Sequence, residues 1–195
     1  VWVFPGHYTE TLTMKSGVNL VSVDGPANTI IDGNNLGPII VMSADAAVVG
    51  FTIQNGYNWG GGGIIVSHTD DASVLIKNNR LVNNRGGSAG AINIGYASPK
   101  IVGNWFINNS TSGTTTSTSP CIEGSHGSPN ITNNVFWNNS GGECISFYYQ
   151  SGGTIYNNTF VGNRGGISVR YQDIRNNIII DSTSAGIGGS IYEYY

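Results

Sequence analysis

The chain has 195 residues, the length of a single domain that can bury a sizeable core. Its net charge is -3, only 10% of its residues are charged, and no basic cluster is present, which argues against nucleic acid and anionic membranes as partners. The hydrophobic content of 39% is that of a folded protein, and no apolar run approaches the roughly 20 residues of a membrane-spanning helix. We therefore expect one domain over residues 1–195, with no membrane insertion.

The chain begins directly with "VWVFPG", a strand-like segment without an initiator Met or a signal peptide. This start predicts a processed protein or a piece of a longer one. The low charge, the many Thr and Ser residues and several Asn-x-Ser/Thr sequons are typical of an extracellular or cell-surface protein.

A short phrase recurs from Val48 onward and is clearest in "ITNNVFWNNS", residues 131–140. The apolar segments are short, β-branched and separated by Gly and Asn, and no amphipathic segment of helical period is found. This pattern predicts strands and tight turns in an all-β fold, a parallel β-helix (solenoid) of about eight coils. The copies of the phrase are spaced by 19 to 30 residues and include "IKNNRLVNN" from Ile76, "IVGNWFINN" from Ile101, "IYNNTFVGN" from Ile155 and "IRNNIIIDS" from Ile174.

Equivalent residues of successive coils lie about 4.8 Å apart in such a fold, so similar side chains form ladders. Ladders are expected for the Asn residues, because Asn tolerates left-handed turns and its amide both donates and accepts hydrogen bonds. The apolar position between the Asn pairs is expected in the core, where Phe106, Phe136 and Phe160 would stack. A structural role is the favoured interpretation of these Asn residues, which include Asn79, Asn104, Asn134, Asn158 and Asn177.

The opening segment from Pro5 to Gly33, "PGHYTETLTMKSGVNLVSVDGPANTIIDG", and the repeats after it resemble the right-handed parallel β-helix proteins of the pectin-lyase-like superfamily. The resemblance includes a P-G-x-Y-x-E turn ahead of the first full coils and covers essentially the whole chain. It implies a right-handed β-helix. Members of that superfamily include lyases, polygalacturonases, methylesterases, epimerases, phage tailspikes and adhesins, so the fold does not decide the activity.

The enzymes of that superfamily use several carboxylates together with Arg or Lys, and sometimes calcium, on one long face. In the expected register, no position of this chain combines three carboxylates with a basic residue. Glu123 and Glu143 form the best paired-carboxylate candidate, with His126 in the same region, and solvated edge charge is the alternative interpretation. Because none of the catalytic motifs of the family can be placed on this sequence residue by residue, we favour a protein without catalytic activity.

An aromatic or imidazole ring occupies the same place in five successive coils, four residues after an aligned Ile. If these rings face outward they form a strip that binds carbohydrate, and if they cap a turn they only stack between coils. No metal site is expected, because the two His residues would lie about 9.6 Å apart with a Tyr between them, and no cofactor is expected. The residues of this predicted carbohydrate-binding strip are His68, Tyr96, His126, Tyr149 and Tyr171.

A second apolar column directly follows the core position of the phrase. Neighbouring strand residues point to opposite faces, so a regular strand cannot bury both columns. Either a bend turns both columns inward, or the second column is exposed and marks a protein contact. We expect the bend. The column comprises Val82, Ile107, Trp137, Val161 and Ile180.

Cys121 and Cys144 occupy equivalent positions of consecutive coils, and the coil spacing of about 4.8 Å permits a disulfide. A bridge in an oxidising compartment and two buried free thiols are both open at this point. Neither residue is expected to be a nucleophile, because no His is clearly paired with it.

Residues 110–120, "STSGTTTSTSP", predict a loop that protrudes from the stack. Neither terminus shows an amphipathic cap, which predicts either continuation in a longer chain or end-to-end self-association into a fibre. The sequence thus predicts a non-catalytic extracellular β-helix module for structural assembly or for attachment to a surface or polysaccharide. The alternative is a polysaccharide lyase or glycoside hydrolase that uses Glu123, His126 and Glu143.

Overall fold

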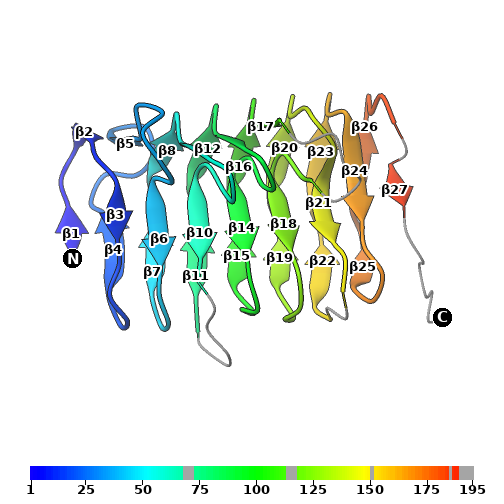
Figure 1. Cartoon of the computed structure of the whole chain (residues 1–195), viewed down its shortest axis with the longest axis horizontal. Helices are drawn as coiled ribbons and strands as arrows, with labels where there is room; N and C mark the ends of the chain where they lie inside the picture. Colours follow the sequence, from blue (N-terminus) through cyan, green and yellow to red (C-terminus); the bar gives the residue numbers. More distant parts are fainter. Residues whose placement is uncertain (68–72, 113–117, 150–151, 185, 189–195) are drawn as a thin grey trace.

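A computed structural model describes residues 1–67, 73–112, 118–149, 152–184 and 186–188 of the chain. Over these residues the regular structure consists of short strands that pair in parallel, and no helix is present. Accordingly, the described residues contain no helix that is long and apolar enough to cross a membrane. The strands stack side by side along the long axis of the molecule (Figure 1).

Within the described residues, three sheets of eight strands each run along the stack. Sheet A contains β1 (Trp2–Val3), β4 (Asn19–Ser22), β7 (Ala47–Val49), β11 (Leu75–Lys77), β15 (Lys100–Val102), β19 (Asn130–Thr132), β22 (Thr154–Tyr156) and β25 (Asp173–Arg175). Sheet B contains β2 (Gly6–Thr9), β5 (Thr29–Asp32), β8 (Thr52–Gln54), β12 (Arg80–Val82), β16 (Trp105–Ile107), β20 (Val135–Trp137), β23 (Thr159–Val161) and β26 (Ile178–Ile180).

Sheet C completes each coil and contains β3 (Leu12–Thr13), β6 (Ile40–Met42), β10 (Ile64–Val66), β14 (Ile92–Ile94), β18 (Ile122–Gly124), β21 (Glu143–Phe147), β24 (Gly165–Ser168) and β27 (Ile187–Gly188). A short additional sheet is formed by β9 (Tyr57–Asn58), β13 (Arg85–Gly86) and β17 (Ser110–Thr111). The chain therefore visits sheets A, B and C in turn, and the predicted parallel β-helix is confirmed.

The aligned residues of the repeat stack in the predicted register. Ile131 pairs with Ile101 on one side and with Ile155 on the other, and all three are fully buried. In sheet B, the ring of Phe136 is stacked between those of Phe106 and Phe160, with centroid distances of 4.6 and 4.4 Å. The predicted aromatic ladder thus lies in the core.

The two residues of each Asn pair have different positions. Asn133 adopts a left-handed backbone conformation, with φ of 57°, and its side chain is exposed, whereas Asn134 is 1% exposed. The Asn134 amide donates to the Ile101 carbonyl at 2.9 Å and to Asn158 Oδ1 at 3.0 Å. Its own Oδ1 accepts hydrogen bonds from the main chain and the side chain of Asn104. The predicted Asn ladders therefore form, and there are two: Asn79, Asn104, Asn134, Asn158 and Asn177 in one, and Asn84, Asn109, Asn139 and Asn163 in the other.

The prediction that a bend turns the second apolar column of the repeat into the core is wrong. Phe136 is fully buried, but Trp137, which follows it, is 52% exposed. The strand is only three residues long, and the left-handed Asn138 starts the turn immediately after Trp137. The strand therefore keeps its normal alternation, and the second apolar column faces solvent.

Candidate functional site

The outer face of sheet B is apolar from β16 to β26. Trp105 and Trp137 lie on adjacent strands and are 48% and 52% exposed, and Thr159 interrupts an otherwise hydrocarbon surface. Pairing places Trp105 opposite Val135 and Trp137 opposite Ile107, so the two indoles lie diagonally across the sheet. We name this surface the apolar stripe: Trp105, Ile107, Val135, Trp137, Val161, Ile178 and Ile180.

Rows of exposed Asn side chains border the apolar stripe on both sides. They are the left-handed members of the Asn pairs, which leave their amides outside the core. Across neighbouring coils, Asn138 Nδ2 donates to Asn108 Oδ1 at 2.8 Å. We name these rows the amide rims: Asn133, Asn157 and Asn176 before the strands of the stripe, and Asn108 and Asn138 after them. Asn78 and Asn83 extend the two rows to β12, and Gly162 and Asp181 take the place of Asn after β23 and β26.

This arrangement combines two kinds of contact. The stripe offers flat hydrocarbon and indole surface, and the rims offer neutral groups that both donate and accept hydrogen bonds. A sugar ring has the complementary combination, since its faces carry C–H groups and its edge carries hydroxyls. The stripe from β16 to β26 spans three strand spacings, about 14 Å, which is long enough for more than one sugar ring.

Three residues of the predicted carbohydrate-binding strip, Tyr96, His126 and Tyr149, form a ring stack next to sheet C. The ring of His126 lies between those of Tyr96 and Tyr149, at centroid distances of 4.5 and 5.0 Å and nearly parallel to both, at 9° and 11°. Tyr96, Tyr149 and Tyr171 are 45%, 62% and 52% exposed, and His68 lies outside the described residues. The rings cover one another's faces, so the stack presents mainly ring edges to solvent. Carbohydrate binding by this aromatic column, Tyr96, His126, Tyr149 and Tyr171, stays a prediction.

Glu123 lies on the outer side of sheet C in a partly covered polar cluster. Its Oε2 accepts a hydrogen bond from Asn93 in the preceding coil. Burial raises the pKa of Glu123 to about 7. The Tyr148 hydroxyl donates to Ser146 Oγ at 2.9 Å, and burial, with a contribution from the charge of Glu123, raises the pKa of Tyr148 to about 12. A carboxyl that titrates near neutral pH can donate or accept a proton there.

The other two catalytic candidates are held by different parts of the chain. Glu143 Oε1 accepts a hydrogen bond from Ser184 Oγ at 3.2 Å, so Glu143 is bonded towards the last coil and Glu123 towards an earlier one. His126 is held in the ring stack, and its buried Nδ1 has no hydrogen-bond partner in the described part of the chain. No hydrogen bond or ion pair among the described residues joins Glu123, Glu143 and His126.

Cys121, directly before β18, and Cys144, on the neighbouring β21, are fully buried free thiols. Burial and a hydrogen bond to Cys144 raise the pKa of Cys121 well above its ordinary value. Both thiols lie in the hydrophobic core, remote from the solvent that a nucleophile needs to meet its substrate.

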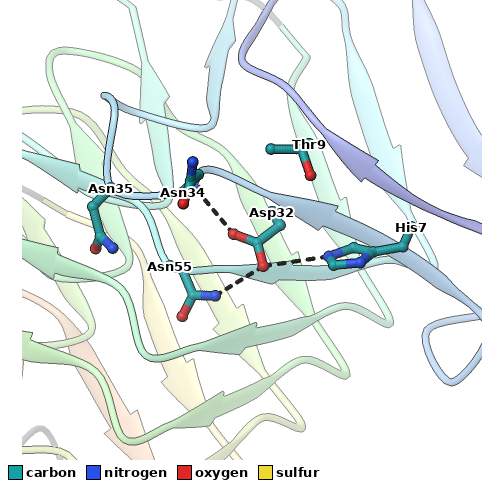
Figure 2. A pocket seen from close by; sticks show the side chains of 6 residues that line it. All are labelled: His7, Thr9, Asp32, Asn34, Asn35 and Asn55. Atoms are coloured by element: carbon teal, nitrogen blue, oxygen red, sulfur yellow. Dashed lines mark hydrogen bonds and ion pairs between the residues drawn. The ribbon is translucent and has the colours of Figure 1, made fainter.

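A polar hollow that the sequence did not predict lies at the other end of sheet B, where β2, β5 and β8 lie side by side (Figure 2). Its central contact is between His7 Nε2 and Asp32 Oδ2, 3.3 Å apart. The pairing of Thr9 with Asp32 places the two on adjacent strands. This register was invisible in the sequence because the first coils lack the Asn phrase. The polar hollow is lined by His7, Thr9, Asp32, Asn34, Asn35 and Asn55.

Together, the stacked sheets and the Asn ladders define this chain as a parallel β-helix protein. A family model described as NosD, a periplasmic copper-binding protein, matches residues 117–192, which is less than half of the chain. The chain is thus similar to that family over its C-terminal coils. No curated protein and no solved structure gives a significant match.

The residues of the matched segment do not fit a copper centre. The segment contains one His, two Cys and no Met. The ring of His126 is stacked between two Tyr rings, whereas Cys121 and Cys144 are buried in the core. Among the described residues, no group of three or more His, Cys, Asp or Glu side chains could hold a metal ion. We therefore derive no copper chemistry for this chain.

Proposed function

We propose that this protein is a non-catalytic extracellular module that attaches to an uncharged polysaccharide through the apolar stripe. The observation that carries the proposal is the exposure of Trp105 and Trp137, 48% and 52%, on adjacent coils between two rows of exposed Asn amides. Exposed apolar patches on a folded protein mark binding surfaces.

The chemistry of the surface favours a neutral glycan over a charged one. No charged residue lies on the outer face of sheet B from β16 to β26. An acidic polysaccharide would lose its hydration over these four strands, which carry no cation; an exposed Arg80 lies beside the stripe on β12, opposite Trp105. A neutral glycan can place its C–H faces on the indoles and exchange hydrogen bonds with the amide rims.

The fold supports attachment by presenting this surface in a fixed form. The strands β16, β20 and β23 anchor their middle residues in the core, as Phe106 and Phe136 show, and lie between the two Asn ladders. Little conformational freedom of the protein is therefore lost on binding, which favours affinity. The similarity to a family described as periplasmic supports a location outside the cytoplasm.

Affinity electrophoresis in gels that contain neutral polysaccharides tests the proposal. The double variant Trp105→Ala/Trp137→Ala is expected to bind about tenfold or more weakly, because both indole platforms are lost. The matched control is Tyr96→Ala/Tyr149→Ala, which removes two exposed rings of the aromatic column and leaves the stripe intact. Retardation that survives loss of both Trp residues, or that disappears in the Tyr variant instead, contradicts the proposal.

A second candidate function, polysaccharide cleavage, is favoured by one observation at Glu123. Burial raises the pKa of this carboxyl to about 7, and Asn93, Ser146 and Tyr148 lie around it. An acid–base role predicts that Glu123→Gln abolishes the release of reducing ends or unsaturated products. The attachment role predicts that no such products form with the wild-type chain and that Glu123→Gln binds polysaccharide as the wild type does.

A further inference from the structure

The polar hollow lies on the same outer face as the apolar stripe but towards the N-terminal end of the stack. It has a volume of ≈ 260 Å³ and lies at the carboxyl ends of β2, β5 and β8. Figure 2 shows the side chains of Asn34, Asn55 and His7 arranged around Asp32. In sheet B, β8 borders the hollow and β16 begins the apolar stripe, and only β12 lies between them. The distance from β8 to the stripe is therefore about two strand spacings, roughly 10 Å.

Asp32 is a fixed anion in the hollow. Its Oδ2 accepts hydrogen bonds from Gln54 Nε2 at 2.8 Å and Asn55 Nδ2 at 2.9 Å and lies 3.3 Å from His7 Nε2. Its Oδ1 accepts the Asn34 N–H at 2.8 Å and retains capacity for a second donor. Burial acts to raise the pKa of Asp32, but the hydrogen bonds outweigh it and hold that pKa below its ordinary value.

Several neutral groups around this anion are free to bind a ligand. Within the described part of the chain, the Thr9 hydroxyl and the side-chain amides of Asn34 and Asn35 have no hydrogen-bond partner. Both Asn residues are exposed and have left-handed backbone conformations, with φ of 46° and 58°, so the turn itself holds them at the edge of the hollow. The hollow therefore offers hydroxyl and amide groups at its edge and one carboxylate oxygen at its base.

Size and charge narrow the class of ligand. The hollow is smaller than the roughly 300–1,000 Å³ of sites for drug-sized molecules, which suits a single ring. The ionised carboxylate repels anionic ligands such as uronic acids and phosphates, and among the described residues no Lys or Arg lines the hollow. His7, beside Asp32, is the lining side chain that carries a positive charge when it is protonated. Among the described residues, the side chains here do not form a group that could hold a metal ion.

We propose that the polar hollow binds one uncharged sugar ring, with Asp32 Oδ1 accepting from a ring hydroxyl and with Asn34, Asn35 and Thr9 completing the contacts. This inference rests on the proposed function, because it places a further subsite on the glycan-binding face. It also predicts which polysaccharides bind: one of neutral sugars is accepted at this subsite, and one of acidic sugars is rejected.

Saturation-transfer NMR with single sugars tests this inference. The probes are glucose, galactose, N-acetylglucosamine and glucuronate, each offered to the wild-type chain and to the double variant Asn34→Gly/Asn35→Gly. Gly adopts positive φ without strain, so the variant removes the two amides and leaves the backbone of the turn unchanged. We expect a signal from at least one neutral sugar, a signal from glucuronate that is several times weaker, and binding about tenfold weaker in the Gly variant.

The variants separate this inference from the proposed function. Trp105→Ala/Trp137→Ala is expected to lose retention on the polymer, while the share of the single-sugar signal that the Asn34→Gly/Asn35→Gly change removes is retained. A second variant, Asp32→Asn, is expected to lessen the discrimination against glucuronate. The inference is overturned if no neutral sugar gives a signal with the wild type, if the Gly variant binds as well as the wild type, or if glucuronate binds as well as the neutral sugars.

Discussion

At the residue scale, the two Asn residues of each pair have separate tasks. Asn133 lets the chain turn because Asn tolerates the left-handed region, and Asn134 satisfies main-chain and side-chain groups of three coils. The sequence alone predicted both properties of Asn, because both follow from its short amide side chain. The sequence did not show which Asn of the pair turns the chain and which one forms the ladder, because this depends on where the turn begins relative to the strand.

Asn134→Ala is expected to lower the free energy of unfolding by about 3–5 kcal/mol, because it leaves buried groups of Asn104 and Ile101 without partners. The matched control is Asn133→Gly, which keeps the left-handed turn and is expected to change stability by no more than about 0.5 kcal/mol. Urea unfolding followed by circular dichroism measures both. Equal effects of the two substitutions would contradict the division of tasks.

Glu123 makes stability depend on pH. Burial raises its pKa from 4.5 to about 7, so the folded chain holds this proton more tightly than the unfolded chain does. The stability is therefore expected to fall as pH rises from about 4.5 to about 7, by about 3 kcal/mol from this group. Glu123→Gln should remove this loss and be more stable than the wild type at pH 8, an effect that urea midpoints across this range will measure. If the variant has the same pH dependence of stability as the wild type, Glu123 is not its cause.

At the element scale, the strands of sheet B from β12 to β23 are three-residue units whose middle residue is buried and whose outer residues are exposed to different extents. Phe106 and Phe136 are fully buried, whereas Trp105 and Trp137 are about half exposed. The repeat identified the buried column because the core position is always apolar. The prediction that a bend buries the second apolar column was wrong, because composition does not distinguish an exposed Trp from a buried one. The three-residue strand and the turn that follows it directly place the second apolar column on the outer face.

The two cysteines also belong to this scale, because they stack on adjacent strands of sheet C. Both are buried free thiols, and burial raises the pKa of Cys121. We expect neither thiol to react at a measurable rate with Ellman's reagent in the native chain, and both to react in concentrated guanidinium. Thiols that stay unreactive after unfolding would show that the two residues form a disulfide in the protein as isolated.

At the scale of the whole molecule, one long face carries the features that we connect with function. The polar hollow lies at the N-terminal end of the outer face of sheet B and the apolar stripe lies towards the C-terminal end. The fold was predictable because the repeat covers the coils from Val48 onward. The hollow was not, since His7 and Asp32 meet only through the register of β2 with β5, where no repeat marks the alignment.

End-to-end self-association of the stack stays a prediction. Val1, Trp2 and Phe4, at one end of the stack, are 70%, 72% and 70% exposed. Electron microscopy of the purified chain over a range of concentrations would show regular fibres if the ends pair. Discrete particles at every concentration would remove this idea and leave attachment through the outer face of sheet B untouched.

The most direct test of attachment through the apolar stripe is fluorescence quenching of its tryptophans. The chain has four Trp residues, and Trp2→Phe/Trp59→Phe leaves Trp105 and Trp137 as the only sources of tryptophan emission. If the stripe binds the glycan, acrylamide quenching of this variant should fall at least about twofold when a neutral polysaccharide saturates it, because the ligand covers both indoles. If the polysaccharide binds and the quenching stays the same, the glycan lies elsewhere and the central claim is wrong.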